Sequence, residues 1–154
     1  MAQYQMLFDP YSHRAMAMIY SGFDVLLNPA LGEGFGITVL EAQSCGIPAI
    51  VTDSTAMREV CGAGWKVKHT PYWSGLRSWM TIPDIDDIHD ALEECYAMSP
   101  EARERLGVVA RKHAEQYDAA RVWDEHWLPT MRVIEQRFDS QKPIRIAPRK
   151  AVAA

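Results

Sequence analysis

Short apolar runs alternate with helical patterns over the first half of the chain. Residues 23–28, 49–52 and 65–67 are apolar without a regular alternation of polar positions, which is typical of strands covered on both faces. Helical patterns at about 37–44 and 53–60 separate these runs. Strands that alternate with helices at such short spacing predict an α/β fold with a small parallel sheet and right-handed crossovers.

The second half is mainly helical in pattern. An aromatic stretch at 69–83 reads as a loop, and helical patterns follow from residue 85, from residue 100 after a Ser99 cap, and from about 119 to 138. Pro129 should kink the last helix. We expect residues 1–138 to form one partial domain with carboxy-terminal helices, and residues 139–154 to be a flexible tail.

Composition and charge narrow the possible partners. Hydrophobic residues make up 48% and charged residues 23% of the 154 residues, which is a globular composition. The net charge of −4 provides no basic footprint for nucleic acid, and no apolar run is long enough for a transmembrane segment. Three cysteines without metal-ligand spacing, and a start without the features of a signal peptide, lead us to expect a cytoplasmic protein with reduced thiols.

The segment around residues 32–42 carries the most chemical information. Gly34 and Gly36 flank Phe35 directly before a helix, so bare backbone amides lie at the positive end of a helix dipole and suit a phosphate or pyrophosphate. Glu33 precedes these amides, and Glu41 lies about one turn into the helix. An ionised carboxylate can accept two hydrogen bonds from a vicinal diol such as a ribose. One ligand could therefore contact the amides, Glu41 and Glu33 together.

Glu33 and Glu41 are eight positions apart, and the run EGFGITVLEAQSCGIPAIVTD resembles the E-x7-E signature of group 1 retaining glycosyltransferases of the GT-B fold. In that family the motif lies in the carboxy-terminal, Rossmann-like domain that binds a nucleotide-sugar donor. The resemblance implies that Glu41 holds the ribose and that Glu33 lies beside the donor sugar in a catalytic or orienting role. The other donor-binding positions that it implies are Gly34, Phe35, Gly36, Ile37, Thr38 and Val39, the last three at the pyrophosphate.

The resemblance covers only part of such an enzyme. A complete GT-B protein has two Rossmann-like domains with the active site between them, and this chain matches the latter part of the carboxy-terminal one. We expect a partial Rossmann-like parallel sheet with flanking helices, in the donor part of an enzyme that transfers sugar from a nucleoside-diphosphate sugar with retention. The resemblance implies no cofactor and no metal ion, and it leaves the acceptor unidentified. The chain alone should be inactive, and it should form a homo-oligomer or pair with the missing amino-terminal domain.

Two other classes of function remain open: a noncatalytic module that binds a nucleotide sugar or phosphate, and a structural or assembly subunit.

Several other features of the sequence have plainer interpretations. We expect Cys45 to contribute packing, and the acidic stretch at 84–94 to be a helix cap and a solvated face. The five scattered histidines fit core or surface roles. The aromatic residues of 72–80 should cover the core, although they could also stack on a sugar or a partner.

Overall fold

The computed structural model describes residues 12–140, which separate into two units, 12–117 and 118–140. The segment at 3–8 and most of the expected tail at 139–154 fall outside the described residues. Only Asp139 and Ser140 of that tail are described, and both belong to the last helix.

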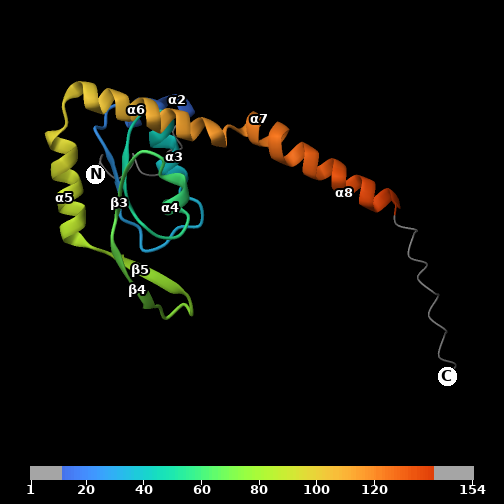
Figure 1. Ribbon diagram of the computed structural model, residues 1–154, viewed down its shortest axis with the longest axis horizontal. Coiled ribbons are helices and arrows are strands. Elements are labelled where there is room, and N and C mark those ends of the chain that lie inside the picture. The colour runs from blue at the N-terminus through green and yellow to red at the C-terminus, as the bar shows by residue number, and fades with distance from the viewer. Residues whose placement is uncertain (1–11, 141–154) are drawn as a thin grey trace, which may run out of the picture. The chain divides into compact units, whose positions relative to one another are not determined.

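The first unit is built around a parallel three-stranded sheet, which confirms the predicted α/β fold (Figure 1). The strand order is β1-β2-β3, with Leu26 paired to Ala49 and Ala49 paired to Gly64. Each crossover carries a helix, as parallel pairing requires. The elements are α2 (His13–Tyr20), β1 (Leu26–Asn28), α3 (Ile37–Ser44), β2 (Ala49–Thr52), α4 (Met57–Val60) and β3 (Gly64–Val67).

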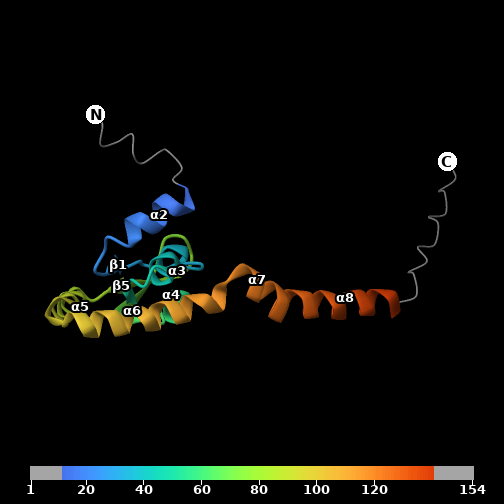
Figure 2. The same ribbon diagram turned by 90° about the horizontal axis from the view of Figure 1, so that it is seen from above.

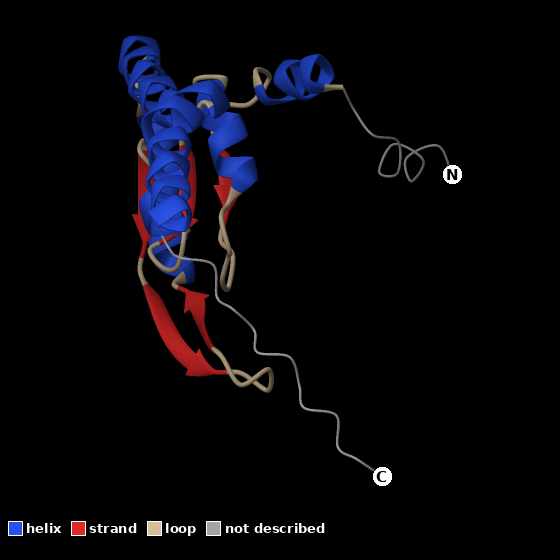
Figure 3. Ribbon diagram, turned by 90° about the vertical axis from the view of Figure 1, so that its right-hand side faces the viewer, coloured by secondary structure: helices blue, strands red, loops and turns tan. Residues whose placement is uncertain are grey.

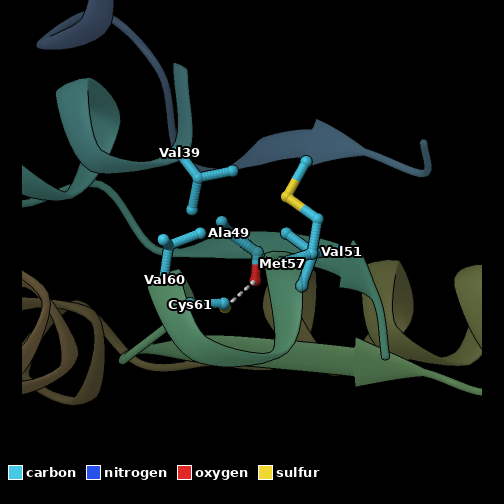
Figure 4. Packing of buried hydrophobic residues seen from close by; sticks show 6 residues of the cluster. All are labelled: Val39, Ala49, Val51, Met57, Val60 and Cys61. Carbon is cyan, nitrogen blue, oxygen red and sulfur yellow. Dashed lines mark hydrogen bonds between the residues drawn. The ribbon is translucent and has the colours of Figure 1, made fainter. Parts of the chain in front are cut away.

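The central strand β2 is buried along its whole length, and its side chains enter two separate apolar clusters. Ala49 and Val51 pack with residues of α3 and α4 on one face of the sheet (Figure 4). Ile50 points to the opposite face, where it packs with Val67 and with Ala91 of α5 (Ile85–Ala97). This alternation across a strand covered on both faces explains its continuous apolar sequence.

Two predicted elements are shorter than their sequence pattern suggests. β1 begins at Leu26 rather than at residue 23, because its first bond to the neighbouring strand is from the Leu26 N–H to the Pro48 carbonyl (2.9 Å). The helix expected from residue 53 begins only at Met57, since Thr55 has a φ of +49° that a right-handed helix cannot contain.

Residues 69–83 form an antiparallel hairpin, so the loop expected there is wrong. The hairpin consists of β4 (His69–Trp73) and β5 (Trp79–Pro83), with Trp73 opposite Trp79. It continues from the end of the parallel sheet at which the arrowheads lie (Figure 3). Trp73 is 58% exposed and Trp79 is 68% exposed. These two rings therefore do not cover the core, and our expectation that they would is wrong. They contact each other edge to face, with ring centroids 5.4 Å apart.

The helices that follow the hairpin begin where the sequence predicted. Asp84 caps α5 through the Asp87 N–H, and Ser99 caps α6 (Pro100–Ala114), which is followed by the single turn η1 (Glu115–Tyr117). α6 packs on α3 near Gly107, where a Cβ atom would lie 2.6 Å from the Gly46 carbonyl oxygen. Figure 2 shows α2 and α6 on different sides of α3.

The second unit is a helix interrupted by a wider π turn rather than by a simple kink. α7 (Ala119–Val122) continues through η2 (Trp123–Trp127) into α8 (Leu128–Ser140). The Leu128 N–H bonds to the Trp123 carbonyl, five residues back, directly before Pro129. Such a turn is one way in which a helix accommodates an irregularity. Among the described helices of both units, none has the length and apolar character to cross a membrane.

Candidate functional site

The loop between β1 and α3 lies at the carboxyl end of the parallel strands (Figure 3). Open α/β sheets bind ligands at this edge. The loop contains Glu33, Gly34 and Phe35, and it ends at Gly36, which is the N-cap of α3. The structure therefore places the predicted glycine-rich segment at a helix start on the edge where a ligand would bind.

Gly36 fixes the loop against the core. Its φ is +87°, in the left-handed region that favours glycine. A Cβ atom at this position would lie 3.0 Å from a Val60 methyl carbon and 3.1 Å from the Met57 sulfur. Gly34 has open space around it, since a Cβ atom there would meet nothing within 4 Å. One glycine is thus required by packing, whereas the other leaves the backbone accessible.

The start of α3 exposes two of the three residues assigned to the pyrophosphate. Ile37 is 61% exposed, and Thr38 is exposed with its hydroxyl oxygen accepting from the Asn28 side-chain amide (3.2 Å). Val39 is fully buried in the core cluster of Figure 4, and its N–H donates to the Gly36 carbonyl (3.1 Å). The first N–H groups of a helix have no partner inside the helix. Those of Ile37 and Thr38 are the accessible donors of this turn.

Glu33 is exposed, and a residue from another loop holds its backbone. The Glu33 N–H donates to the Thr55 hydroxyl oxygen (3.1 Å), and Thr55 is the residue with the positive φ that delays α4. Next to it, the buried Ser54 hydroxyl lies 2.9 Å from the Thr81 hydroxyl of the hairpin. Thr81 also donates to the Leu31 carbonyl through both its N–H (2.9 Å) and its hydroxyl (3.0 Å). The sequence did not reveal these anchors, which lie far from Glu33 along the chain.

Glu41 faces α2. Its carboxylate accepts a hydrogen bond from the Tyr20 hydroxyl (2.9 Å), and both residues line a cavity of about 160 Å³ between α2 and α3. Burial, followed by the bond to Glu41, raises the pKa of Tyr20 to about 12, so the phenol remains a donor at neutral pH. A carboxylate has about four acceptor positions, so Glu41 can accept further hydrogen bonds beside that from Tyr20.

Gln43 has a structural role that the sequence analysis did not identify. It is fully buried in α3, and its amide nitrogen donates to the carbonyls of Val60 (2.7 Å) and Val39 (3.3 Å). Its amide oxygen accepts from the backbone N–H groups of Gly62 (2.9 Å) and Ala63 (3.0 Å). The signal in the sequence was a polar residue on an otherwise apolar helical face, because a buried polar side chain needs hydrogen-bond partners.

The cysteines and the possible metal ligands show no arrangement that indicates catalysis or metal binding within the described residues. Cys61 and Cys95 are buried and Cys45 is half-buried, and all three are free thiols. Burial raises the pKa of Cys61 to about 11 and also raises that of Cys95. Within residues 12–140, no group of three His, Cys, Asp or Glu side chains is arranged to hold a metal ion.

Comparison with known proteins points to one family. The profile described as "Glycosyl transferases group 1" matches residues 5–97. The chain is 31% identical to a D-inositol 3-phosphate glycosyltransferase of Saccharomonospora viridis over 75% of this chain and 24% of that protein. It is 29% identical to another of that name from Paenarthrobacter aurescens, over 72% of this chain and 26% of the relative.

A GDP-mannose-dependent alpha-mannosyltransferase of Mycolicibacterium smegmatis is also 29% identical, over 71% of this chain and 24% of the relative. The chain therefore spans about a quarter of the length of the curated relatives that it matches.

Proposed function

Because the chain belongs to the group 1 glycosyltransferases, we propose that it is the latter part of a domain that binds a nucleoside-diphosphate sugar for transfer to an acceptor. The observation that carries this proposal is the exposed start of α3 at the carboxyl edge of the sheet, with Glu33 in the loop before it and Glu41 about one turn further along the helix. The sugar, the base and the acceptor are left open.

In this proposal the diphosphate binds at the N–H groups of Ile37 and Thr38. These donors lie at the positive end of the α3 dipole, where an anion is stabilised. Glu41 accepts hydrogen bonds from the ribose hydroxyls while Tyr20 holds one of its oxygens. Glu33 lies at the far end of the loop, beside the donor sugar. Phe35 and Gly36 contribute backbone amides, and Gly34 allows the ligand to approach the backbone closely.

The proposed reaction transfers the sugar with retention of anomeric configuration, as the E-x7-E resemblance implies. The bond between the anomeric carbon and the diphosphate oxygen breaks, and the developing negative charge needs donors that are already oriented. The amides of the α3 start can supply these, because their direction is fixed by the helix and by the packing of Gly36 on Met57 and Val60. The proposal requires neither a cofactor nor a metal ion.

Nucleotide binding tests the assignment. We expect the chain to bind UDP or GDP by isothermal titration calorimetry, and Glu41→Gln to weaken binding by about 1.5–3 kcal/mol, or tenfold and more, because a charge-assisted pair is lost. The amide side chain of this variant would still offer an oxygen to Tyr20, so the α2 contact should remain. Glu33→Gln should leave nucleotide affinity unchanged and reduce only the additional affinity for the nucleotide sugar.

The control is Glu104→Gln, which changes the same charge on the exposed face of α6. Equal nucleotide affinity in the parent, Glu41→Gln and Glu104→Gln would contradict the ribose assignment. Failure of the parent to bind any of UDP, GDP and ADP would remove the donor-site proposal and leave the assembly subunit. Binding followed by no transfer, even with an added amino-terminal domain, would instead indicate a noncatalytic binding module.

A further inference from the structure

Three aromatic rings connect the carboxy-terminal end of the first unit to the loop of the candidate site. The Phe35 ring contacts the Tyr117 ring edge to face, with centroids 6.1 Å apart and an interplanar angle of 78°. Tyr117 in turn contacts His113, with centroids 5.6 Å apart. Phe35 belongs to the loop, whereas Tyr117 ends η1 and His113 lies in the last turn of α6.

The α6 end of this chain of rings is held by packing. His113 is half-buried over Gly62, where a Cβ atom would lie 1.9 Å from the imidazole Cγ. Its Nε2 atom is buried and has no hydrogen-bond partner within the described residues, so the ring is positioned by its contacts rather than by hydrogen bonds. Tyr117 packs against the core cluster of Val39, Met57 and Val60. Tyr117 therefore rests on the core of the first unit, and His113 rests on the backbone at Gly62.

Between the Glu33 N–H, which Thr55 holds, and Gly36, the loop makes few side-chain contacts. Phe35 is 50% exposed, and the neighbouring Gly34 has no atom within 4 Å of the position that a Cβ would take. Gly36 is seated on Met57 and Val60, so it fixes only the helix side of the turn. The contact with Tyr117 thus restrains the Phe35 side chain itself, between the Glu33 and Gly36 anchors, and the Phe35 amide is one of those proposed to meet the donor.

We infer that Tyr117 is a positioning residue for donor binding: its ring holds Phe35, and thereby the backbone amides of the Gly34–Gly36 turn, in the orientation that the donor requires. This inference rests on the proposed function, since it assigns Tyr117 to the same site. It places a determinant of the donor loop in the sequence more than eighty residues after it. Aromatic pairs of this geometry are stabilising beyond their buried area.

The test compares Tyr117→Leu with Tyr117→Phe in the chain. Tyr117→Leu should weaken UDP or GDP binding by about three- to tenfold, the range expected for loss of one aromatic pair. Backbone amides of residues 33–38 should also exchange hydrogen faster. Tyr117→Phe keeps the ring, so its nucleotide affinity and its amide exchange rates should equal those of the parent. The matched control is Tyr96→Leu, which removes a ring that is 82% exposed on α5.

A double-mutant cycle with Phe35→Leu separates positioning from general destabilisation. If Tyr117 acts through Phe35, the effects of Phe35→Leu and Tyr117→Leu on affinity and on amide exchange should be non-additive. This expectation holds even if Tyr117→Leu also lowers the melting temperature. Additive effects, or unchanged exchange and affinity in Tyr117→Leu, would overturn the inference. If the parent binds no nucleotide, the proposed function fails, while the exchange measurement still decides whether Tyr117 orders the loop.

Discussion

Gln43 connects three segments of the first unit through one buried side chain. Its four hydrogen bonds reach α3 itself, the end of α4 and the turn that leads into β3. Because the amide group has both a donor and an acceptor end, it satisfies carbonyl and N–H groups at the same time. No apolar residue of similar size can replace both functions.

We therefore expect Gln43→Met to lower the free energy of unfolding by about 2–5 kcal/mol, since it leaves the Ala63 N–H and the Val60 carbonyl buried without a partner. Urea denaturation followed by circular dichroism measures this loss. Gln116→Met, at an exposed position of η1, is the control and should change stability by less than about 0.5 kcal/mol. Similar stabilities of the two variants would show that the Gln43 bonds contribute little.

Thiol reactivity should follow the burial of the three cysteines. With a pKa of about 11, only about one Cys61 side chain in a thousand is a thiolate at pH 8, and burial also raises the pKa of Cys95. The half-buried Cys45 should therefore react first with iodoacetamide. Mass spectrometry of the labelled peptides checks the order, and labelling of Cys61 should increase as the pH rises toward 11. Preferential labelling of Cys61 at pH 8 would contradict the raised pKa.

At the scale of elements, the sequence predicted the limits of those helices and strands whose ends are marked by residues next to them in the chain. α3 and β2 have the predicted limits because Gly36, Gly46 and Pro48 mark their ends in the sequence itself. The pattern of Glu33, Gly34, Gly36 and Glu41 could likewise be read from the sequence, because these residues lie in one short segment of the chain. The start of α4 was not, since the positive φ of Thr55 accompanies a bond to Glu33, which is 22 residues away.

The hairpin and the anchors of the site depend on long-range pairing. A strand pattern was obscured at 69–83 by Pro71 and by a long turn, and its register appears only when Trp73 lies opposite Trp79. Tyr20, Thr81 and Tyr117 meet the candidate site through the folded sheet and helices, so no local spacing indicated their roles.

Thr81 makes the hairpin part of the support of the loop. Thr81→Val keeps the shape of the side chain but leaves the buried Ser54 hydroxyl without the Thr81 oxygen, whereas the Leu31 carbonyl retains the backbone N–H of residue 81. We expect a loss of about 1–2 kcal/mol in the free energy of unfolding. Thermal and urea denaturation measure it, with the exposed Thr70→Val of β4 as the matched control. An effect no larger than that of Thr70→Val would exclude a supporting role for this hydroxyl.

At the scale of the whole molecule, the part of the sheet formed by residues 12–140 has an open side at β1. Within the described residues, β1 pairs only with β2, and apolar side chains near it are exposed, including Leu27 at 43% and Phe23 at 42%. An unpaired strand edge with apolar surroundings favours pairing with another chain. The proposal of a separate amino-terminal domain and the proposal of a homo-oligomer are two ways of covering this side.

We therefore predict that the chain self-associates at micromolar concentration and transfers no sugar on its own, because one wall of a two-domain cleft cannot align donor and acceptor. A symmetric dimer is the simplest closed assembly. Multi-angle light scattering, with an assay of donor turnover on the same sample, measures both properties. A monomer would contradict the assembly prediction, and rapid transfer by the chain alone would contradict its description as part of an enzyme.

The base of the hairpin has a consequence for how this protein could be modified. The Asp84 N–H donates to the Lys68 carbonyl (2.8 Å), so the residues on either side of 69–83 are already hydrogen-bonded to each other. Asp87 also accepts from the Lys68 N–H and from its ammonium group, both at 2.7 Å. Residues 69–83 thus form a cassette whose two ends meet on the scaffold. We expect that it can be shortened or exchanged without changing the path of the chain from β3 into α5, provided that the replacement offers a new donor to the Leu31 carbonyl and a new partner to the Ser54 hydroxyl.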